Sequence, residues 1–186
     1  MKRFFTTLLC ATTLFAMVGC SSSSDSSDTG STNNAQPTEK ITAEDGLATG
    51  YIVDTFSNAF FDFTVNSAES AESYESIVPA EGNKLVITEL TIQNTSSQTI
   101  PMFSTDFMIA WSDGDDDFAL PVNYYDESIT ATDMFDEEYE LVINEKRTGL
   151  YIFEVPEDEQ DFILMFEEYF DNGEEGDLFG VYFTAK

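Results

Sequence analysis

The sequence predicts an all-β protein built as an antiparallel β-sandwich. Short runs in which apolar and polar residues alternate recur from about residue 50 to the C-terminus, and turn-forming residues separate these runs. Alternation with a period of two is typical of strands that bury one face. A helical period is scarce in the same part of the chain, so we expect seven to nine short strands packed as two sheets.

The strongest strand candidate is the stretch 81–96, which we expect to be central. It begins with a turn around Gly82 and continues with β-branched and aliphatic residues. With a period of two, Val86, Leu90 and Ile92 share one face with Thr88. The sequence therefore predicts that these four side chains lie on the same side of one sheet.

Further segments show the same alternation and are expected to form the other strands: 61–65, 107–111, 118–120, 139–143, 151–155, 162–166 and 179–183. Pro156 should end one of them, because proline has no amide to donate to a neighbouring strand. The polar segment 67–82 carries acidic residues at helical spacing, which favours a short helix there. Trp111 continues the alternating face of its strand, so we expect it in the core.

The N-terminal residues predict export and lipid attachment. A basic start is followed by a short apolar stretch that ends in Met17-Val18-Gly19-Cys20. This arrangement is typical of a secretory signal, and its last four residues resemble the lipobox of bacterial lipoproteins. We therefore expect residues 1–19 to be a lipoprotein signal peptide and Cys20 to receive the lipid.

The segment that follows the cysteine predicts a linker. Residues 20–48 are rich in Ser, Thr, Asp and Asn and contain almost no large apolar side chain. Such a composition buries too little surface to fold, so a disordered linker is expected. The remaining residues, 49–186, are expected to form the β-sandwich domain.

Composition excludes several function classes. A formal net charge of -29 disfavours nucleic acid as a partner, because affinity for nucleic acid comes from neutralising phosphates with basic residues. The chain has no histidine, and its two cysteines, Cys10 and Cys20, both lie at the N-terminus. The commonest general base and a thiol nucleophile are therefore missing from the domain, and we do not expect an enzyme.

One acidic cluster is a candidate cation site. Asp113, Asp115, Asp116 and Asp117 flank Gly114 in a predicted turn. Calcium takes six to eight oxygen ligands, and closely spaced aspartates supply several of them. The spacing does not fit the EF-hand loop, however, and we favour the interpretation of an acidic turn exposed to solvent. We therefore expect no cofactor and keep calcium as the alternative.

Several stretches together resemble a known family of bacterial lipoprotein domains of unknown function. They are 63–69, 81–96, 104–107 with the turn at 113–114, and 149–166. The resemblance implies a telokin-like, immunoglobulin-like fold behind a lipobox and a Ser/Thr-rich linker. It implies no catalytic residues.

These observations predict a non-catalytic binding or interaction module at the bacterial cell envelope. The expected partners are the membrane, reached through the N-terminal lipid, and an envelope or extracellular protein. Ser21 is not the aspartate that would resemble an inner-membrane retention signal, so an outer-membrane location is expected if the cell has one. The alternative is a calcium-dependent adhesion or sensing module that uses the acidic loops.

Overall fold

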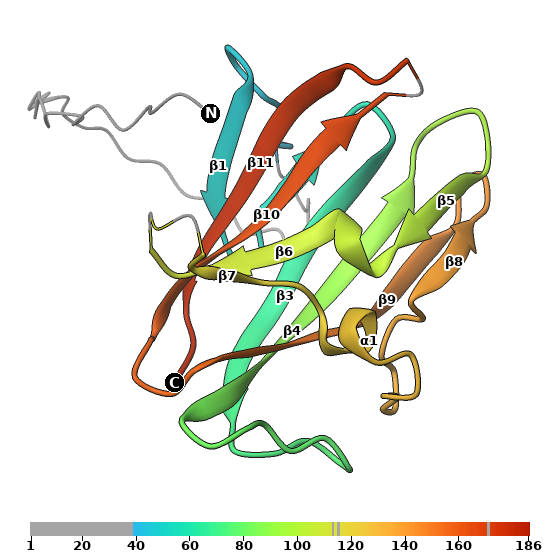
Figure 1. The fold of residues 1–186 in the computed structure, drawn as a ribbon. Coiled ribbons are helices and arrows are strands. Elements are labelled where there is room, and N and C mark those ends of the chain that lie inside the picture. Colours follow the sequence, from blue (N-terminus) through green and yellow to red (C-terminus); the bar gives the residue numbers. More distant parts are fainter. Residues whose placement is uncertain (1–38, 113, 115, 171) are drawn as a thin grey trace, which may run out of the picture. The chain divides into compact units, whose positions relative to one another are not determined.

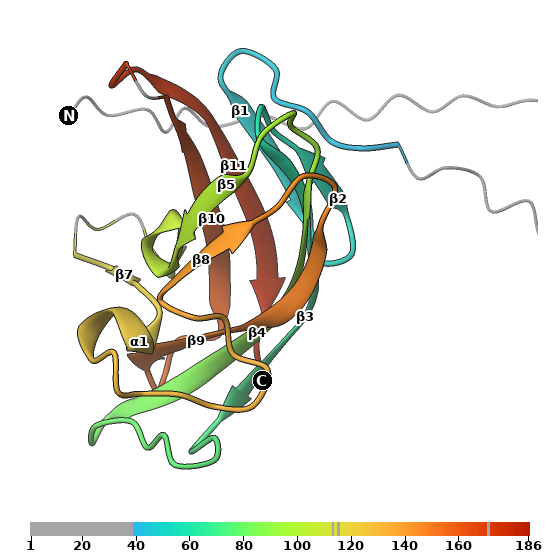
Figure 2. The same ribbon diagram turned by 90° about the vertical axis from the view of Figure 1, so that its right-hand side faces the viewer.

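The computed structural model describes residues 39–112, 114, 116–170 and 172–186, and these form a β-sandwich (Figures 1 and 2). One sheet has five strands in the order β1-β11-β10-β6-β7. Its strands are β1 (Leu47–Tyr51), β6 (Phe107–Ala110), β7 (Phe118–Ala119), β10 (Asp161–Tyr169) and β11 (Glu175–Thr184). The predicted all-β, immunoglobulin-like sandwich is confirmed.

The second sheet has four strands in the order β2-β3-β4-β9. Its strands are β2 (Thr55–Ser57), β3 (Phe61–Ala71), β4 (Asn83–Asn94) and β9 (Lys146–Pro156). A separate two-stranded sheet joins β5 (Ile100–Phe103) to β8 (Glu138–Leu141). Two single turns of helix complete the described elements: η1 (Ser104–Asp106) and α1 (Val122–Tyr125).

Strand β4 has the predicted register and is central to its sheet. It pairs with β3 on one side and with β9 on the other. Val86, Thr88, Leu90 and Ile92 are all fully buried, as the alternation predicts. Strand β9 ends at Pro156, also as predicted.

Two local expectations are wrong. The segment 67–82 does not contain a helix, because β3 continues to Ala71 and pairs with β4 as far as Leu85. The sandwich is also not wholly antiparallel, since β1 and β11 pair in parallel. These are the first and last strands of the domain, so no tight turn forces them to run in opposite directions.

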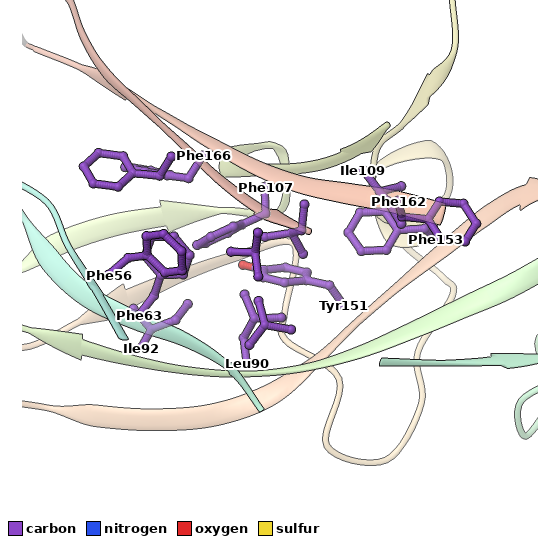
Figure 3. Packing of buried hydrophobic residues seen from close by; sticks show 14 of the residues in the cluster. Phe56, Phe63, Leu90, Ile92, Phe107, Ile109, Tyr151, Phe153, Phe162 and Phe166 are labelled. Carbon is purple, nitrogen blue, oxygen red and sulfur yellow. The ribbon is translucent and has the colours of Figure 1, made fainter. Parts of the chain in front are cut away.

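The core between the sheets consists largely of aromatic side chains (Figure 3). Phe63 of β3 meets Phe107 of β6 edge-on, with ring centroids 5.4 Å apart. Phe107 also lies 5.4 Å from the ring of Tyr151 on β9. Edge-to-face and tilted ring pairs contribute roughly 0.5–1.5 kcal/mol each beyond the burial of their area. Trp111 is only partly buried and packs at the margin of this core.

The folded domain begins earlier than predicted, so the linker boundary at residue 48 is wrong. The backbone of Ile41 donates to Thr55 and accepts from Ser57, both over 2.8 Å. Lys40 forms an ion pair with Asp62, which is 6% exposed. A short polar stretch thus joins the fold through backbone hydrogen bonds, which composition does not reveal.

Residues 37–186 form one compact unit. This unit contains every described strand and both hydrophobic clusters, so it carries its own core and folds by itself. Residues 1–38 lie outside the described part of the chain, and with them the predicted signal peptide, Cys20 and most of the linker. Among the described residues, no helix has the length and apolar character needed to cross a membrane.

Candidate functional site

A second hydrophobic cluster lies on the outer face of the four-stranded sheet. Leu85 and Ile87 of β4 and Ile152 of β9 are buried there, on the face opposite the main core. Ile77, from the connection between β3 and β4, and Val122 of α1 pack onto them. The outer face is therefore covered by two long connections, 72–82 and 120–137, and not by a third layer of regular structure.

The two connections do not close over this cluster completely. Between them lies a groove of about 500 Å³, which we call the α1 groove. Its floor includes the buried side chains of Ile77, Ala119 and Val122. Such a volume falls within the range of pockets that hold small molecules or the side chains of a partner.

Large apolar side chains at the rim of the α1 groove stand in solvent. Val78 is 72% exposed, Tyr125 is 67% exposed and Phe118 is 44% exposed. Each comes from a different segment: the β3–β4 connection, α1 and β7, respectively. Exposed apolar side chains gathered around a hollow are typical of recognition sites, whereas single exposed apolar residues are common everywhere.

One wall of the groove is held by hydrogen bonds that a carboxylate accepts. Glu154 of β9 accepts from the backbone amide of Ala80 over 3.0 Å and from the side-chain amide of Asn83 over 2.6 Å. These bonds fix the end of the β3–β4 connection against the sheet. Glu154 itself lines the groove and is the single carboxylate among its described lining residues.

A smaller pocket of about 120 Å³ lies on the other side of α1 and the turn after it. We call it the acidic pocket, because Glu127, Asp136 and Glu137 line it together with Asn123. Ile129 lines both the α1 groove and the acidic pocket, so the two hollows are neighbours. Side chains of α1 contribute to each of them.

A half-buried carboxylate lies in η1, directly after β5 of the small sheet. Asp106 accepts a hydrogen bond from the backbone amide of Phe103 over 2.8 Å. Burial raises the pKa of Asp106 to about 6, and the bond from Phe103 only partly opposes this. Burial also raises the pKa of the Tyr139 hydroxyl above its usual value. Asp106 therefore titrates at a higher pH than an exposed aspartate.

The structure gives only part of the predicted cation cluster. Asp113 and Asp115 lie outside the described residues, while Asp116 and Asp117 belong to the turn between β6 and β7. The Asp117 carboxylate accepts a hydrogen bond from the Ser112 hydroxyl, which in turn accepts from the amide of Gly114. Among the residues that the structure describes, no three carboxylate, histidine or cysteine side chains are grouped so as to hold a metal ion.

Sequence reasoning missed the α1 groove. Val78, Phe118 and Glu154 belong to no recognisable binding motif in the sequence. A signal existed in β4 and β9, where Leu85, Ile87 and Ile152 place apolar side chains on the face opposite the core. Such double-sided strands indicate that something covers the outer face.

Comparison with solved structures supports the fold. The ycdA protein of Bacillus subtilis, a proposed lipoprotein, matches with a TM-score of 0.53 at 10% identity, over 73% of this chain and 39% of that chain. This chain therefore spans well under half of the ycdA structure. The yjhA protein of Bacillus subtilis matches with a TM-score of 0.51 at 18% identity, over 70% of this chain and 98% of that one.

No curated protein matches the sequence. A family model does match it, over residues 51–175, which include strands β2 to β10 and both hollows beside α1. The expected resemblance to a domain of unknown function with a sandwich fold is thus confirmed. This chain belongs to the family described as Domain of unknown function (DUF4352).

Proposed function

We propose that this protein is a lipid-anchored extracytoplasmic binding module of the bacterial envelope. Anchoring through Cys20 is supported by the signal-like N-terminus, by the lipobox-like residues 17–20 and by the fold shared with ycdA, a proposed lipoprotein. The partners of the module are the membrane, through its lipid, and an envelope or extracellular protein. The linker holds the acidic domain away from anionic lipid, which would repel it.

The α1 groove is the observation that carries the binding role. Three large apolar side chains surround an apolar floor in a hollow of about 500 Å³, and hydrogen bonds to a carboxylate hold one of its walls. An apolar group that binds there is removed from water, which stabilises the complex by about 25 cal/mol per Å² of apolar surface buried. The groove therefore binds an apolar group of the partner.

Binding without catalysis is part of this proposal. Among the described residues that line the groove, Glu154 is the single carboxylate, and the Ala80 amide and the Asn83 side chain both donate to it. Acid–base catalysis on a bound group needs a positioned donor or acceptor that is free to exchange a proton. Glu154 serves as a brace for the groove instead.

A neutral apolar dye tests the groove. We expect N-phenyl-1-naphthylamine to bind the isolated 37–186 domain saturably, with a rise in its fluorescence. Ser76 is an exposed residue of the groove lining, so Ser76→Phe should fill the hollow and remove the saturable signal. Ser73→Phe, in the same connection but outside the lining, is the matched control. Equal dye binding by both variants would contradict the role of the groove.

The anchoring part has its own test. In a bacterial host that processes lipoproteins, we expect the full chain to incorporate labelled palmitate and to partition into the detergent phase of Triton X-114. Cys20→Ser should abolish both, because the thiol receives the lipid. Cys10→Ser, within the predicted signal peptide, should change neither. Palmitate incorporation that survives Cys20→Ser would remove the lipid anchor from this account.

A further inference from the structure

The acidic pocket is built around a buried amide whose oxygen has no donor. Asn123 is 3% exposed, and its side-chain NH₂ donates to the carbonyl of Phe135 over 3.1 Å. Within the described part of the chain, no donor bonds to its side-chain oxygen. A buried acceptor without a donor costs free energy, so a donor brought into this pocket recovers it.

The charge around Asn123 specifies the kind of donor. Glu127, Asp136 and Glu137 line the same pocket, and Glu75 accepts a hydrogen bond from the amide of Thr132, the residue after Ala131 of the pocket lining. No Lys or Arg occurs among the described residues that line either hollow. Close carboxylates repel one another, and a cationic group placed among them removes that repulsion while donating hydrogen bonds.

Three of the five basic residues in the described part of the chain already have a partner. Lys40 pairs with Asp62, the Lys84 ammonium donates to the carbonyl of Glu159, and Arg147 pairs with Glu145. A second copy of this chain therefore offers few free cations and brings a net charge of -29 with it. The chain's own linker, 21–38, contains no basic residue. Charge complementarity thus favours a different protein over a second copy or the linker.

From these observations we infer that the α1 groove and the acidic pocket together bind a basic amphipathic segment of a partner protein. This inference rests on the proposed function and names its partner chemistry. An apolar side chain of the segment occupies the groove, beside Val122. A lysine or arginine a few residues away enters the acidic pocket, with Glu127 and Asp136 as counter-charges and Asn123 as the buried acceptor. Ile129 separates the two positions.

Three short peptides with blocked ends test the inference by isothermal titration calorimetry on the 37–186 domain. The probe is Lys-Lys-Leu-Phe-Lys-Lys. In the charge control glutamine replaces every lysine, and in the anchor control Ser-Gly replaces Leu-Phe. We expect the probe to bind at least about tenfold more tightly than either control. It alone has both an apolar side chain for the α1 groove and a lysine for the acidic pocket. Raising the salt concentration should lower the affinity of the probe for the domain and leave the affinity of the glutamine peptide unchanged.

Substitutions locate the charge effect. Glu127→Gln with Asp136→Asn should weaken the probe by about tenfold and leave the glutamine peptide unchanged. Glu39→Gln with Glu44→Gln removes the same charge from the segment that leads into β1, and should leave probe binding within about twofold. Strand β1 lies at the opposite edge of its sheet from β7. All four positions are exposed, so the variants should keep the wild-type thermal midpoint. The midpoint is measured first for each variant.

Two results would overturn the inference. One is a glutamine peptide or an anchor control that binds as tightly as the probe. The other is an equal loss of affinity in both double variants, which would mean that only the total charge matters. Suppose that the naphthylamine dye still binds and that Ser76→Phe still blocks its binding. Either result then contradicts only the basic segment as the occupant, and the α1 groove remains an apolar binding site. Loss of dye binding in the wild-type domain would remove both.

Discussion

The carboxylate of Glu75 accepts a hydrogen bond from the backbone amide of Thr132. The two carboxylate oxygens lie 3.1 and 3.2 Å from the amide nitrogen. This contact joins the tips of the two connections that border the α1 groove. Glu75 itself has a positive φ of 48°, and Asp133, next to its partner, has a φ of 61°. Non-glycine residues with such angles are uncommon and carry local strain, so tertiary contacts must hold them.

Removing this contact should loosen the connections without unfolding the domain. We expect Glu75→Ala to change the free energy of unfolding by less than about 1 kcal/mol, because the bond is exposed. The Thr132 amide should exchange with solvent several times faster, as measured by NMR-detected hydrogen exchange. Glu72→Ala, at another exposed acidic residue of the same connection, should leave that amide unchanged. Unaltered exchange at Thr132 in Glu75→Ala would show that the contact does not hold the connection.

Asp106 should make the domain less stable as the pH rises. Its folded pKa of about 6 lies above the usual 3.8, so the folded state binds this proton more tightly than the unfolded chain does. Below about pH 4 the carboxyl is protonated in both the folded and the unfolded state. Above about pH 6 it is charged in both states, and there its charge lowers the free energy of unfolding most. Asp106→Asn keeps an oxygen for the Phe103 amide and removes the charge. We expect it to raise the free energy of unfolding by the order of 2 kcal/mol at pH 7.5 and by little at pH 4.

Urea unfolding at the two pH values provides the measurement. The difference between variant and wild type is the relevant quantity, because the many other carboxylates of the chain contribute equally to both. A stabilisation of the same size at pH 4 and pH 7.5 would mean that ionisation of Asp106 is not its cause.

The N-terminal segment 39–47 should contribute to stability. A domain that starts at residue 48 loses the backbone hydrogen bonds of Ile41 and leaves the buried Asp62 without Lys40. We expect it to be about 2–4 kcal/mol less stable to urea than the 37–186 domain. Lys40→Met in the longer domain should account for part of that loss. Coincident urea unfolding curves for the two domains would show that the segment does not stabilise the fold and belongs to the linker.

The calcium-dependent alternative is tested by thermal unfolding of the 37–186 domain in EDTA, calcium or magnesium at constant ionic strength. A ligand at a hundredfold excess over its Kd stabilises the native state by about 2.7 kcal/mol. The alternative predicts a calcium-selective rise in the midpoint that Asp115→Asn with Asp117→Asn removes. Equal small shifts with both ions would indicate charge screening and leave the acidic turn without a cation role.

The sequence predicted the strands that alternate cleanly, because one buried face produces a period of two. The long pairing of β4 and the end of β9 at Pro156 followed directly from that pattern. Lys40 and Ile41 were placed in the linker because backbone hydrogen bonds and a single ion pair leave no trace in composition.

The candidate site was largely beyond prediction. The α1 groove forms where two irregular connections pass over the outer face of β4 and β9, and irregular backbone has no period to detect. Helix α1 spans four residues, too few to show a helical period in the sequence. The aspartates of the 113–117 turn were conspicuous in sequence, yet the structure gives Asp117 a hydrogen bond within its own turn.

The position at which an apolar ligand binds decides whether the α1 groove is a binding site. We would follow the backbone amides of the 37–186 domain by NMR while N-phenyl-1-naphthylamine is added. We expect the largest shifts at Ile77, Val122 and Ile129, which line the α1 groove. The exposed rings of Tyr51 and Tyr182, 6.4 Å apart on β1 and β11, form a second apolar patch. Largest shifts at these tyrosines would place the ligand on the other edge of the sandwich and contradict the account.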